Sequence, residues 1–168
     1  DIARLAAGAV LTAVDNVLDG PPGSRALAMV RPPGHHAEAG KAMGFCLYNN
    51  IAVGAAYARS RGRSRVAIVD FDVHHGNGTQ AMFYADPNVL FVSSHQFPFW
   101  PGTGASGETG EGAGEGFTLN VPLTIGDKDN VVERHYAEVV LPRLREFKPE
   151  LLMVSAGFDA HEVDPLGQ

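Results

Sequence analysis

The stretch "DFDVHHGNGTQ", residues 70–80, places carboxylates and imidazoles together directly after the apolar run "RVAIV". Burying a carboxylate without a partner costs on the order of several kcal/mol, so these groups must be compensated. Imidazoles and carboxylates are common zinc ligands, and a catalytic zinc site uses three protein ligands and keeps one position open. Asp72 and His74 therefore predict part of a metal site, with Asp159 after another apolar run as the natural third ligand. Two oxygen ligands suit zinc, with iron(II) as the alternative metal.

The competing interpretation of this stretch is a structural hydrogen-bond network or a helix cap. That interpretation suits a lone aspartate or histidine at a strand end, but it accounts less well for a cluster. Side-chain alternation along an extended strand would put Asp70, Asp72 and His74 on one face, which favours a shared cation. The same alternation would put His75 on the other face, as a packing residue.

A second polar stretch, "RPPGHHAE" at residues 31–38, contains a tandem pair of histidines. Beside a metal, one of His35 and His36 could act as general base towards a metal-bound water, with the other as an acid or a charge. Each imidazole needs an acceptor on its second nitrogen, and Asp70 and Asn77 are available. Partners of unequal charge would separate the two pKa values. A solvated loop remains the alternative for the pair alone.

These groups must be positioned by strands and helices that the pattern of apolar residues predicts. Helices are expected at 1–20, 48–64, 78–85 and 130–147, and strands at 25–30, 65–73, 88–95, 117–123 and 149–159. Continuous apolar strands that alternate with helices predict a three-layer α/β/α fold with a mainly parallel central sheet. Ligands bind beyond the carboxyl ends of such strands, where the polar clusters lie. Pro142 is expected to kink the last helix.

The segment "GTGASG", residues 102–107, matches a dinucleotide-binding pattern that we discount. Such a loop must follow a strand and open a helix, whereas this one follows "FPFWP" and leads into "ETGEGAGEGFT". Its glutamates at 108, 111 and 115 would repel a pyrophosphate. We expect a loop at the rim of the site, whose acidic residues either attract a cationic substrate or are merely solvated.

The composition narrows the class of protein. A chain of 168 residues with 45% hydrophobic and 19% charged residues is typical of one globular domain. The net charge of -6 argues against direct nucleic-acid binding, and no run of apolar residues is long enough for a membrane span. The single cysteine, Cys46, suits a reducing compartment such as the cytoplasm. The chain shows no signal peptide, starts without Met inside a helix and stops in a loop, so we expect a piece of a longer protein.

Five stretches extend this interpretation from Arg31 onward. They are "RPPGHHAE", "GFCLYNNIAVGA", "VDFDVHHGNGTQ", "PGTGASGETGEGAGEGFTLNVPL" and "SAGFDAHEVDPLG". Together they resemble the histone deacetylase and acetylpolyamine amidohydrolase superfamily. The asparagine in "HHGNGTQ" and the "ETGEGAGEG" loop are similar to its class II branch, with its bacterial members.

This resemblance implies the arginase–deacetylase fold and one zinc deacetylase-like catalytic domain over residues 1–168, truncated at both ends. The implied reaction removes acetyl groups from acetyl-lysine or acetylpolyamine-type amines. The implied zinc ligands are Asp72, His74 and Asp159. The implied catalytic residues are His35, His36, Asp70 and Asn77, with His36 as general base, Asp70 as the partner of His35 and Asn77 as the partner of His36.

The resemblance also implies a substrate channel and bound potassium. The channel would be formed by Gly44, through its carbonyl, and by Phe45 and Trp100. A structural potassium ion would use Asp70, Asp72, His74, Ser93 and Ser94, and a second monovalent site would involve Phe83, Asp86 and Val89. The full-length protein could be an oligomer.

One departure from the family pattern concerns the oxyanion. The family completes that site with a tyrosine in a "GGY"-like loop, whereas this sequence has tyrosines only at 48, 57, 84 and 136. We therefore expect an active full-length deacetylase and an impaired isolated chain. Two alternatives stay open at this stage. One is an inactive acyl-amine binder or scaffold. The other is a dimanganese ureohydrolase, although Gly76 stands where that class carries a further aspartate.

Overall fold

The computed structural model describes residues 1–165 and 167 of the chain. The helices are α1 (Ile2–Leu18), α2 (Asn50–Ser60), α3 (Asn77–Phe83), α4 (Asp129–His135) and α5 (Leu141–Phe147), with a 3-10 turn η1 (Gly112–Gly114) and a π-helical segment η2 (Tyr136–Val140). The strands are β1 (Val66–Asp70), β2 (Val89–Gln96), β3 (Thr118–Leu123) and β4 (Leu151–Ser155).

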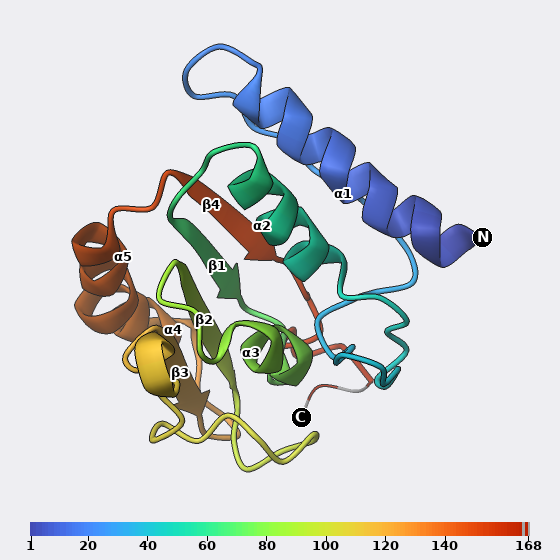
Figure 1. Ribbon diagram of the computed structural model, residues 1–168. Coiled ribbons are helices and arrows are strands. Elements are labelled where there is room, and N and C mark those ends of the chain that lie inside the picture. Colours follow the sequence, from blue (N-terminus) through green and yellow to red (C-terminus); the bar gives the residue numbers. More distant parts are fainter. Residues whose placement is uncertain (166, 168) are drawn as a thin grey trace.

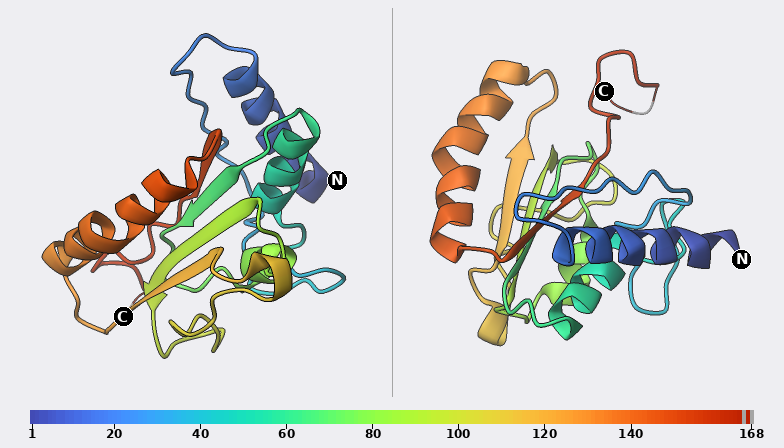
Figure 2. Two further views of the ribbon diagram at one scale, coloured as in Figure 1. Left: turned by 60° about the vertical axis from the view of Figure 1, so that its left-hand side comes forward. Right: turned by 90° about the horizontal axis from the view of Figure 1, so that it is seen from above.

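The four strands form one parallel sheet in the order β3-β2-β1-β4. Helices α1, α2 and α3 lie on one face of the sheet, and the continuous helical segment from α4 through η2 to α5 lies on the other (Figures 1 and 2). This arrangement confirms the predicted three-layer α/β/α architecture. It also brings the carboxyl ends of the strands together at one end of the sheet, because Asp70 is in register with both Ser93 and Ser155.

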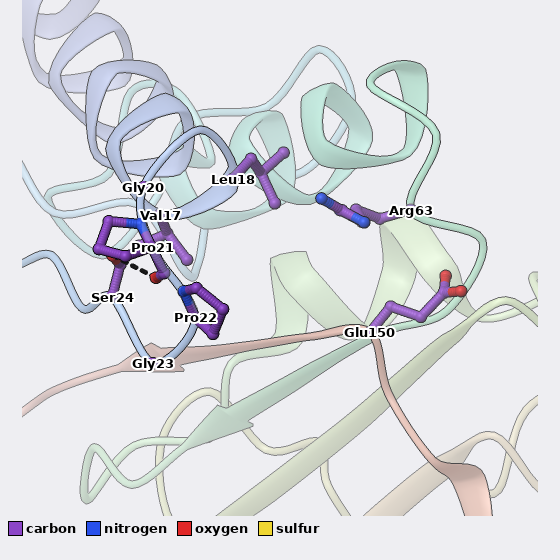
Figure 3. Close-up of a pocket in the computed structure, with 9 residues that line it drawn as sticks. All are labelled: Val17, Leu18, Gly20, Pro21, Pro22, Gly23, Ser24, Arg63 and Glu150. Atoms are coloured by element: carbon purple, nitrogen blue, oxygen red, sulfur yellow. Dashed lines mark hydrogen bonds between the residues drawn. The ribbon is translucent and has the colours of Figure 1, made fainter.

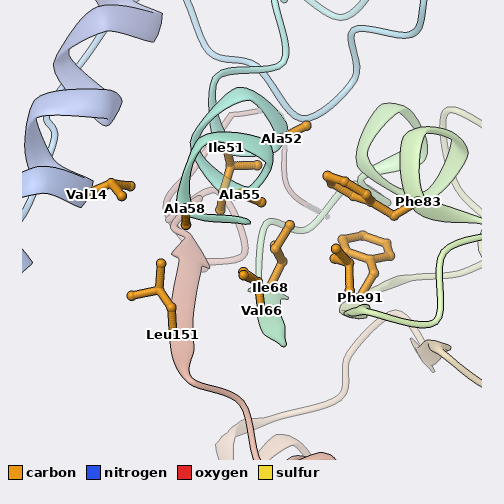
Figure 4. Packing of buried hydrophobic residues seen from close by; sticks show 11 residues of the cluster. Val14, Ile51, Ala52, Ala55, Ala58, Val66, Ile68, Phe83, Phe91 and Leu151 are labelled. Carbon is orange, nitrogen blue, oxygen red and sulfur yellow. The ribbon is translucent and has the colours of Figure 1, made fainter. Parts of the chain in front are cut away.

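Two hydrophobic clusters hold the three layers together, and side-chain alternation along β1 divides its residues between them. Val66 and Ile68 pack under α1, α2 and α3, as Figure 4 shows for that cluster. Ala67 and Val69 pack on the opposite face, against residues that include Val140 and Phe147. All the residues of β1 are buried, which explains why its sequence is a continuous apolar run rather than an alternating one.

The predicted helix at 130–147 changes to a π-helical segment that ends two residues before Pro142. Helix α4 passes into the π-helical segment η2, and α5 then begins with Pro142 in its first turn. A proline has no N–H to donate and its ring crowds the carbonyl four residues earlier. The π-helical segment, which is wider than an α-helix, accommodates the missing hydrogen bond and the crowding that Pro142 causes.

The predicted strand at 25–30 is wrong. The segment is not paired as a strand, and its two largest apolar side chains are exposed, Leu27 at 79% and Met29 at 87%. A strand needs a partner for its backbone hydrogen bonds, and within the described residues none pairs with this segment. A groove of about 980 Å³ lies between it and β4, and His35 and Asp72 line that groove as well.

At the amino-terminal ends of β1 and β4 there is a second, smaller hollow of about 420 Å³. The turn that follows α1 forms one wall, while Arg63 and Glu150 lie on the other side (Figure 3). Ligands of parallel sheets bind beyond the carboxyl ends of the strands, so this hollow lies at the opposite end of the sheet from the expected site. Among the described residues, no helix is long and apolar enough to cross a membrane.

Asn49 joins the loop of the histidine pair to two helices. Its side-chain oxygen accepts a hydrogen bond from the Ala52 amide at 3.1 Å and so caps α2. Its side-chain nitrogen donates to the Ala37 carbonyl at 3.3 Å and to the Thr79 hydroxyl at 3.1 Å. Asn49 is only 2% exposed, so water cannot replace these contacts.

We predict that Asn49→Ala lowers the free energy of unfolding by about 2 to 3 kcal/mol, because it removes a cap and leaves buried groups unpaired. Asn49→Asp keeps the cap acceptor but puts a buried carboxylate oxygen against the Ala37 carbonyl, so it should lower the free energy of unfolding at least as much. Urea-induced unfolding measures both values. A loss below about 0.5 kcal/mol for Asn49→Ala would show that the cap does not hold the loop.

Candidate active site

The site begins where β1 ends, which is earlier than the sequence predicts. The strand stops at Asp70 rather than running to 73, so the following residues form a turn and the alternation argument does not apply beyond it. The Asp70 carboxylate has no exposed surface. One oxygen lies 2.9 Å from His35 Nδ1, and the other accepts the Asp72 amide at 3.2 Å.

The turn brings together Asp72, His74 and Asp159, whose ligand atoms all lie within 4.8 Å of one another. His74 Nδ1 lies 2.8 Å from Asp159 Oδ2 and 3.1 Å from Asp72 Oδ1. Backbone amides hold both carboxylates: Val73 N–H donates to Asp159 at 3.0 Å, and His74 N–H donates to Asp72 at 2.8 Å. A proton on the imidazole therefore occupies the position between the two carboxylates.

The charges of this cluster agree with a cation site. Hydrogen bonds to Asp159 and Asp72 raise the pKa of His74 to about 9 despite its partial burial. Burial opposes ionisation of Asp159, but the hydrogen bonds from His74 and the Val73 amide outweigh it and lower the pKa to about 2. Two carboxylates and one imidazole aimed at one point form a donor set that suits zinc or iron(II).

Beside this cluster, the two histidines of "RPPGHHAE" are stacked. The ring centroids of His35 and His36 are 3.8 Å apart, and both side chains are buried. His35 is bonded to the carboxylate of Asp70, while His36 Nδ1 lies 2.8 Å from the amide oxygen of Asn77. His35 Nε2 also lies 3.6 Å from Asp72, so the pair borders the candidate metal cluster.

The unequal partners separate the two imidazoles electrostatically. Burial alone would lower the pKa of His35, but the charge and hydrogen bond of Asp70 outweigh it and raise the pKa. Burial and the neighbouring charge of His35 lower the pKa of His36 to about 4, although the hydrogen bond to Asn77 opposes this. His35 is therefore the more readily protonated member of the pair, and His36 is neutral at neutral pH.

Comparison with known proteins identifies the family to which the chain belongs. The sequence profile described as "Histone deacetylase domain" matches residues 1–168. The chain belongs to the histone deacetylase family. It is 50% identical over 167 residues to "Histone deacetylase 10, chloroplastic" of Oryza sativa subsp. japonica, covering 96% of this chain and 38% of that protein.

Solved deacetylase-family structures superimpose closely on this chain. The HD domain of HDA15 matches with a TM-score of 0.95 and 46% identity, over 99% of this chain and 49% of that one. An acetylpolyamine aminohydrolase from Burkholderia pseudomallei matches with a TM-score of 0.93 and 41% identity, over 99% and 48% respectively. The predicted family and arginase–deacetylase fold are confirmed, and the chain spans about half the length of these relatives.

An aromatic wall covers the deacetylase-family site on one side. Trp100 lies edge-on to His36, with ring centroids 4.6 Å apart, and Phe99 stacks on His74 at 5.2 Å. Gly44 fits between His36 and Trp100, where a Cβ atom would overlap both rings. The next residue, Phe45, is 83% exposed and has a positive φ of 63°. The predicted channel residues thus lie together, and their contact with substrate stays a prediction.

Sequence reasoning missed a buried polar network beneath this wall. His75 contacts the Thr103 hydroxyl at 2.8 Å and Gln80 at 3.0 Å. His95 Nε2 donates a hydrogen bond to the Gly104 carbonyl at 2.9 Å, and its Nδ1 lies 3.0 Å from the Ser93 hydroxyl. Glu108 accepts hydrogen bonds from the amides of Gly104 and Ala105, at 3.0 and 3.1 Å. Glu108 therefore points inward and anchors the loop that carries Trp100, rather than lying on a solvated rim. The polar end of β2, "SSH", was the one sequence signal for it.

The residues implied in potassium binding lie in two places. Ser93 and Ser94 end β2 beside β1, where Ser93 contacts His95 at 3.0 Å and Ser94 contacts the Tyr136 hydroxyl at 3.0 Å. Phe83, Asp86 and Val89 lie around the turn from α3 to β2, and Asp86 forms an ion pair with Arg59. Both potassium sites stay predictions.

We predict that zinc binding releases about one proton per chain near neutral pH, because His74 must lose the proton it shares with Asp72 and Asp159. Since its pKa is raised to about 9, the apparent affinity should rise about tenfold per pH unit between pH 6 and 8. Isothermal titration in two buffers of different ionisation enthalpy measures the protons released. Asp159→Asn should weaken binding strongly and Asp127→Asn should not. Equal zinc affinity at pH 6 and pH 8 would contradict a proton on His74 between Asp72 and Asp159.

We predict that Gly44→Ala displaces Trp100 and shifts its emission, because the added methyl group meets the rings of His36 and Trp100. Gly40→Ala is the matched control: Gly40 also has a positive φ, of 77° against 55° for Gly44, but open space surrounds it. Both variants carry the backbone strain of a positive φ, about 1–2 kcal/mol, so the difference between their spectra reports the overlap of the added methyl group with the rings of His36 and Trp100. Trp100 is the single tryptophan of this chain, and identical spectra for both variants would contradict the packing.

Proposed function

We propose that this chain supplies the metal and histidine groups of a zinc-dependent amidohydrolase that removes acetyl groups from acetyl-lysine or acetylpolyamine-type amines. The observation that carries the proposal is the stacked pair of His35 and His36, 3.8 Å apart, with one anionic and one neutral partner beside an Asp-His-Asp cluster. Membership of the histone deacetylase family and the likeness to an acetylpolyamine aminohydrolase support this substrate class.

Asp72, His74 and Asp159 would hold the metal, since these three side chains converge and are held by backbone amides. A zinc ion bound there would polarise the amide carbonyl and lower the pKa of a water molecule towards neutrality. Potassium, with the ligands predicted above, would be structural. A cytoplasmic location and an oligomer of the full-length protein remain predictions.

His36 is assigned as general base because it is neutral at the working pH. Its pKa is lowered to about 4, and Nδ1 is engaged by Asn77, so Nε2 is the nitrogen that can accept a proton from the attacking water. A base of this kind contributes roughly 10² to 10⁴ in rate. The edge of Trp100 and the buried position of His36 limit access of bulk water to that nitrogen.

His35 is assigned as the charged member of the pair. The Asp70 carboxylate favours its protonated form, which would stabilise negative charge that develops on the substrate. The water adds to the carbonyl carbon, the carbon–nitrogen bond breaks, and the proton taken from water is delivered to the leaving nitrogen. The products are acetate and a free amine. The Tyr136 hydroxyl contacts the Ser94 hydroxyl at 3.0 Å, and we assign it no part in binding the oxyanion.

The test is hydrolysis of an acetyl-lysine peptide and of an acetylpolyamine by the zinc-loaded full-length gene product. We expect activity on at least one of them and a loss of about 10² to 10⁴ in kcat for His36→Ala, with zinc content unchanged. His135→Ala, on α4 away from the site, is the control and should keep the wild-type rate. An unchanged rate for His36→Ala would refute the general-base role, and no hydrolysis of either substrate would favour an acyl-amine binder.

A further inference from the structure

The amide of Asn77 lies between His36 and a carboxylate that the mechanism does not use. Its oxygen lies 2.8 Å from His36 Nδ1, and its nitrogen donates a hydrogen bond to Glu38 Oε1 at 2.7 Å. Asn77 is 6% exposed and Glu38 is half-buried, so this chain of contacts is largely shielded from water. Glu38 is the last residue of "RPPGHHAE", two positions after the general base.

The surroundings of the Asn77 side chain determine which way its amide points. Besides Glu38, its nitrogen faces the backbone carbonyl of His36 and the sulfur of Met43, each at 3.5 Å. An ionised carboxylate and a carbonyl can only accept hydrogen bonds, so the donor end of the amide must face them. The acceptor end then faces His36 Nδ1, which must carry the proton of that hydrogen bond.

This orientation decides the tautomer of the imidazole. Neutral histidine has one ring proton, and with that proton on Nδ1 the lone pair is on Nε2, where the general base needs it. If the amide were rotated by half a turn, its NH₂ group would face Nδ1 and favour the opposite tautomer. That form carries its proton on Nε2 and cannot accept another there.

We propose that Glu38 is a positioning residue that, through Asn77, holds His36 in the tautomer required of a general base. The inference rests on the function proposed above for His36. It places an anion behind each imidazole of the pair: Asp70 contacts His35 directly, whereas Glu38 acts on His36 through a neutral amide. The amide transmits orientation without placing a negative charge next to His36, which therefore stays neutral.

The backbone around Glu38 is built to hold this carboxylate in place. Glu38 and Lys41 exchange two backbone hydrogen bonds, of 3.0 and 3.2 Å, in an antiparallel bridge that closes a tight turn. The preceding residue, Ala37, is buried, and its carbonyl accepts a hydrogen bond from Asn49. The Glu38 side chain therefore starts from a fixed backbone rather than from a mobile loop.

The test compares Glu38→Ala with Glu38→Gln in the zinc-loaded full-length gene product labelled with ¹⁵N-histidine. Glutamine can offer its amide oxygen to Asn77, so it should preserve the Nδ1-protonated tautomer and stay within about threefold of the wild-type kcat. Alanine removes the acceptor, so ¹⁵N shifts of His36 should move towards the Nε2-protonated form. We expect kcat to fall about 10- to 100-fold with KM nearly unchanged, as for other residues that orient a functional imidazole.

Two further variants separate orientation from folding. Asn77→Asp combined with Glu38→Ala presents an acceptor to His36 Nδ1 without help from residue 38, so Nδ1 should again be protonated. Because the carboxylate also raises the pKa of His36, as Asp70 does for His35, the tautomer of this variant is read at a pH above that pKa. Glu146→Ala, which removes an exposed carboxylate on α5, should change neither the tautomer nor kcat. A rescued double variant would show that the loss in Glu38→Ala is one of orientation rather than of structure.

The inference is overturned if His36 keeps the Nδ1-protonated tautomer in Glu38→Ala. It is also overturned if kcat falls as much in Glu38→Gln as in Glu38→Ala. The tautomer is read by NMR and needs no turnover, so the two hypotheses fail separately. A wild-type protein without hydrolytic activity whose tautomer still depends on Glu38 would refute the proposed function and leave the positioning role intact.

Discussion

The burial of the Asp70 carboxylate is the constraint on which the rest of the site depends. This side chain has no exposed surface and ends the central strand β1, so its charge must be satisfied within the protein. One oxygen is satisfied by His35 and the other by the amide of Asp72, which starts the turn that presents the cluster. Gly76 leaves room for this carboxylate, since a Cβ atom there would lie 2.5 Å from Asp70 Oδ2. Strand end, histidine pair and cluster are thus parts of one electrostatic arrangement.

The division of labour in the histidine pair follows from what lies behind each ring. Two adjacent, identical side chains would titrate alike in water, and in contact with each other they cannot both be charged cheaply. A buried anion next to His35 determines which of them takes the proton, and the resulting charge depresses the pKa of His36 further. The same side chain is therefore easier to protonate at one position and neutral at the next, without any difference in residue type, which suits the two roles proposed for the pair.

The sequence predicts the sheet, the family and the residues of the cluster because these depend on local patterns. Buried parallel strands have continuous apolar sequences, and "DFDVHHGN" places its polar groups at a strand end. The segment 25–30 has the same apolar pattern, but a strand also needs a partner for its backbone, which its own residues do not reveal. Glu108 and Glu38 stand in stretches that carry the family resemblance, but only the folded chain shows that one binds loop amides and the other the Asn77 side chain.

The position of Asp159 in the chain has a consequence for synthesis on the ribosome. His74 and Asp159 are 85 residues apart, and Asp159 follows β4, which pairs directly with β1 rather than with the strand made before it. A nascent chain carries Asp72 and His74 long before the third carboxylate has emerged. The cluster can therefore form only after β4 has paired with β1. The proposed metal site is thereby completed last, because its third ligand follows the strand that is made after the other three strands of the described sheet.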